Sequence, residues 1–183
     1  MSTPILVITG PSGVGKGTLI KGLLERVPGL ELAVSATTRK PRDGEVNGVD
    51  YHFLSERDFD RRAAAGEFVE HAEYAGNRYG TLKSELTRPA RGIVLEIDVQ
   101  GARQVREELP EAVLIFIEPP SFDDLKQRLE ARASDRPEQI ERRLAAAKDE
   151  LKAAGEFDHR IVNADLQRAE RELSDLVATM LPQ

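Results

Sequence analysis

The chain has 183 residues and a net charge of −6, with 40% hydrophobic and 32% charged residues. This composition is typical of one compact globular domain, and the absence of Cys excludes disulfides, thiolate nucleophiles and cysteine zinc sites. The negative charge argues against broad binding to nucleic acid, and no apolar run is long enough to cross a membrane. Since no secretion signal is recognisable, we expect a cytoplasmic protein without a nucleic-acid or membrane partner. The sequence leaves its oligomeric state open.

The first predicted elements are a strand over residues 4–9, where an apolar run stops at Gly10, and a helix over 17–27 with helical spacing of apolar residues. A continuous apolar run is typical of a parallel strand that is covered on both faces. The alternation continues with strands predicted at 92–98, 112–117 and 160–162 and helices at 99–108, 122–132 and 166–181. Strands that alternate with helices predict an α/β fold with a mainly parallel sheet flanked by helices.

Two stretches depart from that alternation. Residues 34–82 are rich in Arg, Gly, Tyr and Glu and carry short strand-like pieces at 51–54 and 68–70, which indicates an inserted β-rich subdomain. Residues 131–138 are polar and lie between two predicted helices, which favours a mobile flap.

The junction of the first strand and the first helix fits the P-loop pattern G-x-x-x-x-G-K, in the residues Gly10, Pro11, Ser12, Gly13, Val14, Gly15, Lys16, Gly17 and Thr18. Glycines let backbone N–H groups turn toward phosphate oxygens, and the helix adds its positive end. Lys16 supplies a mobile charge for the β- and γ-phosphates. The alternative is a Gly-rich turn that only joins strand to helix. The flanking strand and helix favour the phosphate site, and hence a fold of the P-loop NTPase type.

The residue directly after Lys16 is Gly17, where this pattern usually has Ser or Thr, and Thr18 follows one place later. The Gly-Thr arrangement resembles adenylate kinases, in which Mg²⁺ is held largely through water. We therefore expect Mg²⁺ to be bound mainly through the ATP phosphates and water, with Thr18 as the loop side chain that could also ligate it.

The inserted subdomain carries a longer motif over residues 35–45, S-A-T-T-R-K-P-R-D-G-E, followed by G-E-F-V-E at 66–70 and G-N-R-Y-G-T at 76–81. After a P-loop, the run T-T-R-x-P-R-x-G-E resembles guanylate kinases, and the resemblance covers nearly all of the chain. It implies a phosphotransferase that moves the γ-phosphate of ATP to GMP, and also to dGMP. The products are ADP and GDP, formed by direct in-line transfer with Mg²⁺.

The chemistry of guanine agrees with this resemblance. Guanine presents N1–H and an exocyclic amine as donors beside the acceptor O6, so a selective site needs carboxylates and a hydroxyl. Glu70 and Asp98 would be the carboxylates, and arginine forks suit the GMP phosphate. The GMP-binding residues implied by the family's pattern are Ser35, Arg39, Arg42, Tyr51, Glu70, Tyr79, Thr81 and Asp98. Taken singly, the arginines could be solvated surface charges, the tyrosines strand aromatics and Glu70 a surface acid.

In the predicted lid, Arg132 and Arg143 match the arginines that close over the ATP phosphates in guanylate kinases. The implied catalytic residues are therefore Lys16, Arg132 and Arg143. Alanines flank Arg132 where the family usually has glycine, which concerns lid movement more than chemistry. Asn163, after the last predicted strand, resembles a position near the adenine of ATP.

The resemblance also implies how the single domain, 1–183, is divided. The expected parts are a core of about 1–33, 83–124 and 146–183, a GMP-binding subdomain of about 34–82 and a helical lid of about 125–145. Arg128 and Arg136 are further cations of this lid that could substitute for a lid arginine.

Two other hypotheses stay open. A catalytically inactive guanylate-kinase-like scaffold that binds phosphopeptides would share the fold, but such proteins usually have a degenerate P-loop, and Lys16 is retained here. A kinase for another phosphorylated sugar or nucleotide would have no need for Glu70, Asp98 and Thr81 together.

Overall fold

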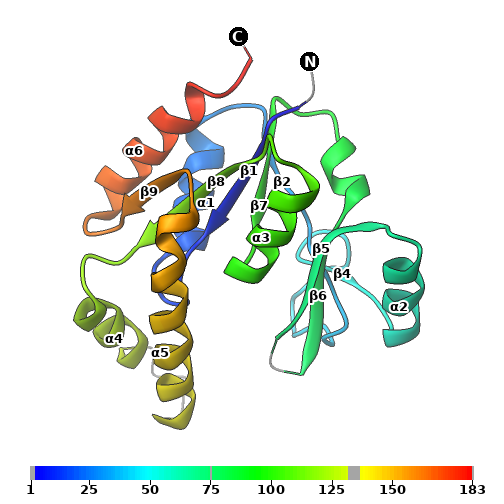
Figure 1. Ribbon diagram of the computed structural model, residues 1–183, viewed down its shortest axis with the longest axis horizontal. Helices are drawn as coiled ribbons and strands as arrows, with labels where there is room; N and C mark the ends of the chain where they lie inside the picture. Colours follow the sequence, from blue (N-terminus) through cyan, green and yellow to red (C-terminus); the bar gives the residue numbers. More distant parts are fainter. Residues whose placement is uncertain (1–2, 75, 132–136, 183) are drawn as a thin grey trace.

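The structure, a computed structural model, describes residues 3–74, 76–131 and 137–182. At its centre is a five-stranded sheet in which all neighbours are parallel, in the order β2-β7-β1-β8-β9 (Figure 1). Its strands are β1 (Ile5–Thr9), β2 (Leu30–Leu32), β7 (Gly92–Glu96), β8 (Val113–Glu118) and β9 (His159–Val162). The predicted α/β fold with a mainly parallel sheet is therefore confirmed.

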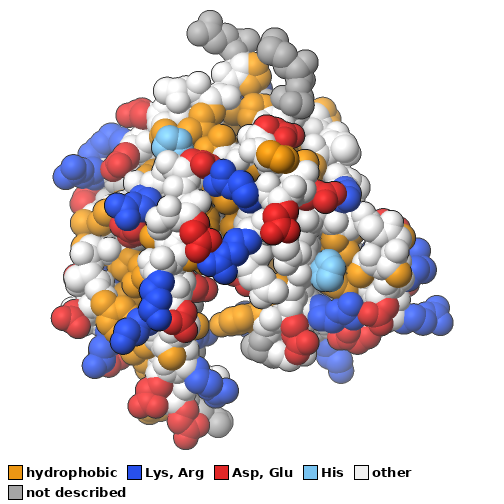
Figure 2. Space-filling model, viewed as in Figure 1, with side chains coloured by type: hydrophobic (Ala, Val, Ile, Leu, Met, Phe, Trp, Pro, Cys, Tyr) orange, Lys and Arg blue, Asp and Glu red, His pale blue; other side chains and the backbone are white. Residues whose placement is uncertain are grey.

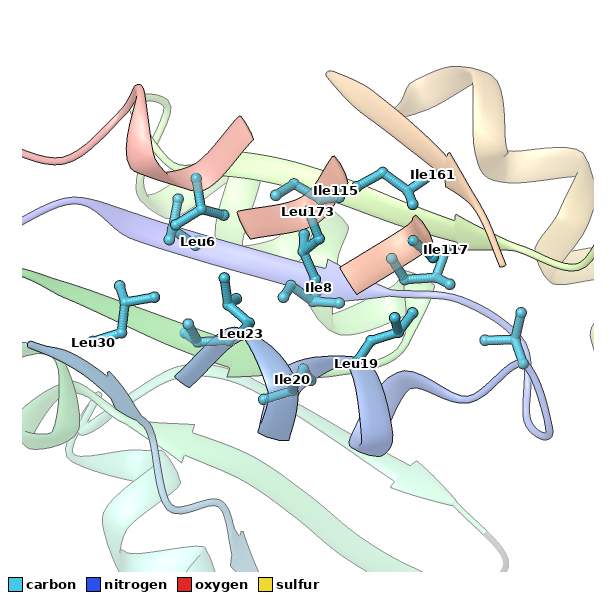
Figure 3. Packing of buried hydrophobic residues seen from close by; sticks show 14 of the residues in the cluster. Leu6, Ile8, Leu19, Ile20, Leu23, Leu30, Ile115, Ile117, Ile161 and Leu173 are labelled. Atoms are coloured by element: carbon cyan, nitrogen blue, oxygen red, sulfur yellow. The ribbon is translucent and has the colours of Figure 1, made fainter. Parts of the chain in front are cut away.

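Alternate residues of β1 contribute to two separate cores. The helices that cover the central sheet are α1 (Lys16–Arg26), α3 (Val99–Glu108) and α6 (Leu166–Ala178). Leu6 and Ile8 are fully buried on the face covered by α1 and α6, where Figure 3 shows Ile8 beside Leu173. Ile5 and Val7 point to the opposite face and pack against α3. Because both faces are covered, every residue of β1 is buried, which explains its continuous apolar run.

A second sheet, of four strands, stands beside the central one in the order β4-β3-β6-β5, with α2 packed against it (Figure 1). Its elements are β3 (Ala36–Thr37), β4 (His52–Phe53), α2 (Glu56–Ala64), β5 (Phe68–Tyr74) and β6 (Asn77–Leu82). Phe59 of α2 stacks on Phe68 of β5 with ring centroids 4.5 Å apart, and both side chains are buried. This sheet is the inserted β-rich subdomain that the sequence predicts, with a helix that it does not predict.

Two further helices, α4 (Phe122–Glu130) and α5 (Pro137–Lys152), extend away from the central sheet (Figure 1). Helix α5 continues without a break past residue 145, where the sequence-based division ends the lid. Most of the predicted flap, including Arg132 and Arg136, lies outside the described residues. Short 3₁₀ helices η1 (Lys83–Thr87) and η2 (Ala153–Glu156) follow β6 and α5.

Several predicted element ends differ from the structure. The strand predicted over 92–98 ends at Glu96, because Asp98 turns to cap α3 and accepts a 2.7 Å hydrogen bond from the backbone N–H of Gly101. The helices predicted to end at 132 and 181 end at Glu130 and Ala178. Within the described ranges, no helix has the length and apolar character needed to span a membrane.

Candidate active site

A cavity of about 510 Å³ lies where the P-loop, the second sheet, the end of β7 and helix α5 meet. The molecular surface is hollowed between the part that carries α5 and the part that carries β5 and β6 (Figure 2). The predicted site residues on the cavity wall are Gly10, Ser12, Lys16, Ser35, Tyr51, Glu70, Tyr79 and Asp98. Ligands of open α/β sheets bind at the carboxyl ends of the strands, and this cavity adjoins the carboxyl ends of β1 and β7.

The P-loop turns tightly because two of its glycines adopt left-handed backbone conformations, with φ of 89° at Gly13 and 96° at Gly15. Between them, the side chain of Val14 is fully buried in the core that α1 and α6 share. The N–H of Val14 donates to the carbonyl of Pro11 at 3.2 Å. The loop is thus anchored by the buried side chain of Val14, in a backbone conformation suited to curling around a phosphate.

Lys16 opens α1 and lies half-buried on the cavity wall. Its ammonium donates to the carbonyl of Gly10 and, at 3.3 Å, to that of Pro11. Burial lowers the pKa of Lys16, and the nearby carboxylates of Glu96 and Glu150 oppose that shift. Phosphate oxygens are stronger acceptors than these carbonyls, so a bound triphosphate would draw the ammonium from the loop.

Asn163 lies behind the P-loop and is only 5% exposed. Its side-chain amide donates to the carbonyl of Val14 at 2.8 Å, and its own backbone carbonyl accepts from the Arg128 guanidinium at 2.9 Å. Asn163 therefore supports the loop backbone, while its contact with adenine stays a prediction. The guanidinium of Arg128, expected as a spare cation of the lid, is used here to hold Asn163.

Glu70 of β5 is the most deeply buried acid of the cavity, with 5% of its surface exposed. The hydroxyl of Thr81, on the neighbouring strand β6, donates to Oε1 of Glu70 at 2.7 Å. Burial raises the pKa of Glu70 to about 7; the hydrogen bonds from Thr81 oppose this rise and the charge of Asp98 adds to it. Thr81 thus acts on Glu70, and its predicted contact with guanine O6 stays a prediction. The alternative that Glu70 is a surface acid is wrong.

Asp98 lies near Glu70, on the turn between β7 and α3. One carboxylate oxygen caps α3, and the side chain lies on the cavity wall with Glu96. The structure therefore brings together the two carboxylates that the sequence assigns to guanine. Ser35 lies on the same wall.

Three of the predicted phosphate-binding residues, Arg39, Tyr51 and Tyr79, lie next to one another. The guanidinium of Arg39 makes a bidentate ion pair with Glu45, at 2.8 and 3.0 Å, and lies over the ring of Tyr51 at 5.2 Å. Tyr51 meets the ring of Tyr79 at 6.2 Å, and its burial raises the pKa of the Tyr51 phenol, which keeps it a donor. The alternative that Arg39 is a solvated charge is wrong. The alternative that Tyr51 and Tyr79 are half-buried strand aromatics stays open, since both are half-buried.

Sequence reasoning gave no role to Glu45, although the residue closes the motif over 35–45. Besides Arg39, its carboxylate accepts from the backbone N–H of Arg42 at 2.7 Å, and the hydrogen bonds of Arg39 lower its pKa. Glu45 thus holds Arg39 and the backbone of Arg42 together. The side chain of Arg42 is exposed.

Helix α5 adds an acid that sequence reasoning also missed. Glu150 lies on the cavity wall, and burial raises its pKa against the opposing charge of Lys16. Arg143, the second predicted lid arginine, is half-buried on α5, seven residues before Glu150 and hence on the same helical face. The seven-residue spacing from Arg143 is the sequence signal that could have placed Glu150 at the site. Arg132, the first lid arginine, lies outside the described residues.

The oxygen ligands near the P-loop fit a Mg²⁺ ion that is carried mainly by phosphates and water. In the parts of the chain that the structure describes, no group of three or more His, Cys, Asp or Glu could hold a metal by itself. Thr18 is exposed in the first turn of α1. Glu96 and Asp98 lie close enough to Lys16 for their charges to raise the pKa of its ammonium. Mg²⁺ commonly keeps several waters and binds one or two protein oxygens beside substrate phosphates, so this sparse set is adequate.

Comparison with known proteins identifies the family. The family model for guanylate kinase matches residues 2–180. The chain is 51% identical over 172 residues to a guanylate kinase of Nostoc sp., covering 92% of this chain and 86% of that protein. It is 51% identical over 181 residues to one of Gloeobacter violaceus, covering 97% and 88%.

The fold gives the same answer. The crystal structure of guanylate kinase from Anaplasma phagocytophilum superposes with a TM-score of 0.78 and 32% identity, covering all of this chain and 88% of that one. With a family match over almost its whole length and relatives at about half identity, the chain belongs to the guanylate kinase family.

Proposed function

We propose that this guanylate kinase phosphorylates GMP, and dGMP with it, in the 510 Å³ cavity, using the γ-phosphate of ATP and releasing ADP and GDP. The observation that carries the proposal is the position of the buried Glu70, beside Asp98, on the same cavity wall as the P-loop residue Lys16. A carboxylate pair suited to guanine and a lysine suited to a triphosphate thus face one space.

The base of GMP is proposed to lie against Glu70 and Asp98, with its phosphate at Arg39, Arg42 and the two tyrosines. Guanine can donate from N1–H and its amine to these carboxylates, whereas adenine presents a lone pair at N1. With AMP, the buried Glu70 would be left without a donor from the ligand. Sites of this kind discriminate by up to about 10⁴–10⁵.

The transfer step is proposed to be in line. An oxygen of the GMP phosphate attacks the γ-phosphorus of ATP, and the bond from that phosphorus to the bridging oxygen breaks, so that the electron pair leaves with ADP. The attacking oxygen is already anionic, so no general base is needed. Lys16 would stabilise the charge on the transferring group, with Arg143 and Arg132 adding to it from the lid.

Mg²⁺ is proposed as the cofactor of this reaction. When bound with ATP, it supplies charge neutralisation at the β- and γ-phosphates. Thr18 would contribute a hydroxyl, and Glu96 would hold the surrounding water.

We also propose the division of the chain into a core, a GMP-binding subdomain of about 34–82 and a lid of about 125–145. The subdomain boundary is supported by the ends of β6 at Leu82 and β2 at Leu32, between the two sheets. Because its substrates are nucleotides of the cell interior, we place the protein in the cytoplasm.

Two substitutions test this assignment. Glu70→Ala should raise the KM for GMP by at least about tenfold and leave the KM for ATP within about twofold, because the removed carboxylate is proposed to contact guanine and not ATP. Glu73→Ala, which removes an exposed acid of the same strand, is the matched control and should change neither value. Lys16→Ala should lower kcat by more than about a hundredfold with an unchanged circular dichroism spectrum. A GMP KM that is equal in Glu70→Ala and wild type would remove Glu70 from the site.

A further inference from the structure

One face of helix α3 meets strand β5 directly behind the proposed guanine acceptor (Figure 1). Gly101 and Gln104 are three residues apart, so both lie on this face. They contact Glu70 and His71, which are neighbours in β5. The helix belongs to the central sheet and the strand to the second sheet, so this contact joins the two parts of the molecule.

Gly101 leaves no room for a side chain on this face. A Cβ at position 101 would stand 2.7 Å from Oε2 of Glu70 and 3.4 Å from Oδ1 of Asp98. The first distance is far inside van der Waals contact, and the second is near its lower limit. The missing side chain of Gly101 therefore provides the space that the two carboxylates share.

Conformation does not explain the glycine. Gly101 lies in the first turn of α3 and has no left-handed backbone angle, so its backbone would accept an alanine. Alanine is a better helix former than glycine, and substitution should favour the helix itself. The constraint at position 101 is the space taken by Glu70.

Glu70 cannot simply turn away from an added Cβ. Its other oxygen, Oε1, is held by the hydroxyl of Thr81 at 2.7 Å, and the side chain is 5% exposed. Strand β5 pairs with β6 at this point, with Glu70 opposite Thr81.

Gln104 prevents strand β5 from moving away from α3 to make room for an added Cβ. Its side-chain amide donates to the carbonyl of His71 at 3.0 Å, and its side-chain oxygen accepts from the N–H of His71 at 3.0 Å. This pair of hydrogen bonds fixes the separation between β5 and α3 one residue away from Glu70.

We propose that Gly101 and Gln104 are positioning residues for guanine: Gln104 sets the distance of β5 from α3, and Gly101 supplies the space for the Glu70 carboxylate. This inference rests on the proposed role of Glu70 as the guanine acceptor. It follows that recognition of the base depends on a helix of the central sheet as well as on the inserted subdomain.

The first test is Gly101→Ala, assayed with the full chain, GMP and ATP. Displacement of Glu70 should raise the KM for GMP by between about tenfold and about a hundredfold. The KM for ATP should stay within about twofold, because the P-loop is not touched by the substitution. Gly155→Ala is the control, since no atom lies within 4 Å of a Cβ added there.

The second test separates a steric effect on Glu70 from a general disturbance of α3. Glu70→Asp shortens the acid by one methylene and withdraws it from position 101. In a cycle of Gly101→Ala with Glu70→Asp, the double variant should bind GMP at least about threefold better than the product of the two single losses predicts. Gln104→Ala adds no atoms and should raise the KM for GMP by at least about threefold.

A GMP KM within about twofold of wild type in folded Gly101→Ala or Gln104→Ala would overturn the inference, and so would purely multiplicative losses in the cycle. Failure of the underlying site looks different, because Glu70→Ala itself would then leave GMP binding unchanged. If Gly101→Ala does not fold, Gln104→Ala decides the matter alone.

Discussion

At the residue scale, Glu70 is an acid whose surroundings oppose its proposed use as an ionised acceptor. Burial raises its pKa to about 7, against the hydrogen bonds of Thr81 and with the help of the charge on Asp98. Donors that hydrogen-bond to the charged form favour it, and guanine brings such donors. Ionisation of Glu70 and binding of GMP are therefore linked.

The raised pKa of Glu70 also predicts how the free energy of unfolding depends on pH. The pKa of Glu70 in the folded protein, about 7, lies above its ordinary value of 4.5. The contribution of Glu70 to the free energy of unfolding is therefore fully present below pH 4.5 and is lost as the pH rises through 7. Glu70→Gln cannot ionise, so without GMP it should be more stable than wild type by up to about 3 kcal/mol above pH 8. The advantage should shrink below about pH 5, as measured by urea unfolding. A difference of the same size at both pH values would contradict the raised pKa.

A second residue-scale prediction concerns Asn163, whose amide holds the carbonyl of Val14. Asn163→Ala would leave that buried carbonyl unpaired, and the free energy of unfolding should fall by about 1–3 kcal/mol. Because the loop then loses its support, the KM for ATP should rise while the KM for GMP stays unchanged. Steady-state kinetics with each substrate varied in turn, beside urea unfolding, measure both effects. An unchanged KM for ATP would show that the loop does not depend on this contact.

At the element scale, the strands of the central sheet were predictable and the helix of the second sheet was not. Strands β1, β7 and β8 are buried on both faces, and their continuous apolar runs stand out in the sequence. Helix α2 is charged along nearly its whole length and buries only Phe59, so no apolar stripe marks it. Strand β6, N-R-Y-G-T-L, mixes polar residues with a glycine and is specified by its pairing with β5 and β3.

Helix α2 carries a local signal at its start, which leads to an element-scale prediction. The hydroxyl of Ser55 accepts from the N–H of Asp58 at 3.1 Å and caps the helix. Ser55→Ala should lower the free energy of unfolding by about 1 kcal/mol, and Ser55→Thr, which keeps the hydroxyl that accepts from the N–H and donates to the carboxylate of Asp58, should retain most of the stability. Chemical denaturation of the three proteins measures this. Equal losses in the two variants would show that the cap is not the cause.

At the scale of the whole molecule, the site is assembled from segments that only the fold brings together. The P-loop was predictable because its residues are contiguous between a strand and a helix. Asn163 supports that loop from 149 residues away, and Glu150 reaches the cavity from the end of α5, after the part of this helix assigned to the lid. No local pattern encodes such contacts, since they depend on how α5 and β9 pack against the loop. The carboxylates proposed to bind guanine, Glu70 and Asp98, were assigned by family resemblance and not by spacing.

The measurement that tests the account most directly compares GMP, AMP, UMP and dTMP as phosphate acceptors, with ATP as donor, in a coupled assay of ADP release. The arrangement of Glu70 and Asp98 predicts that kcat/KM for GMP exceeds that for AMP by at least about a thousandfold, with the pyrimidine nucleotides lower still. Turnover of AMP equal to that of GMP would contradict guanine recognition by these two carboxylates.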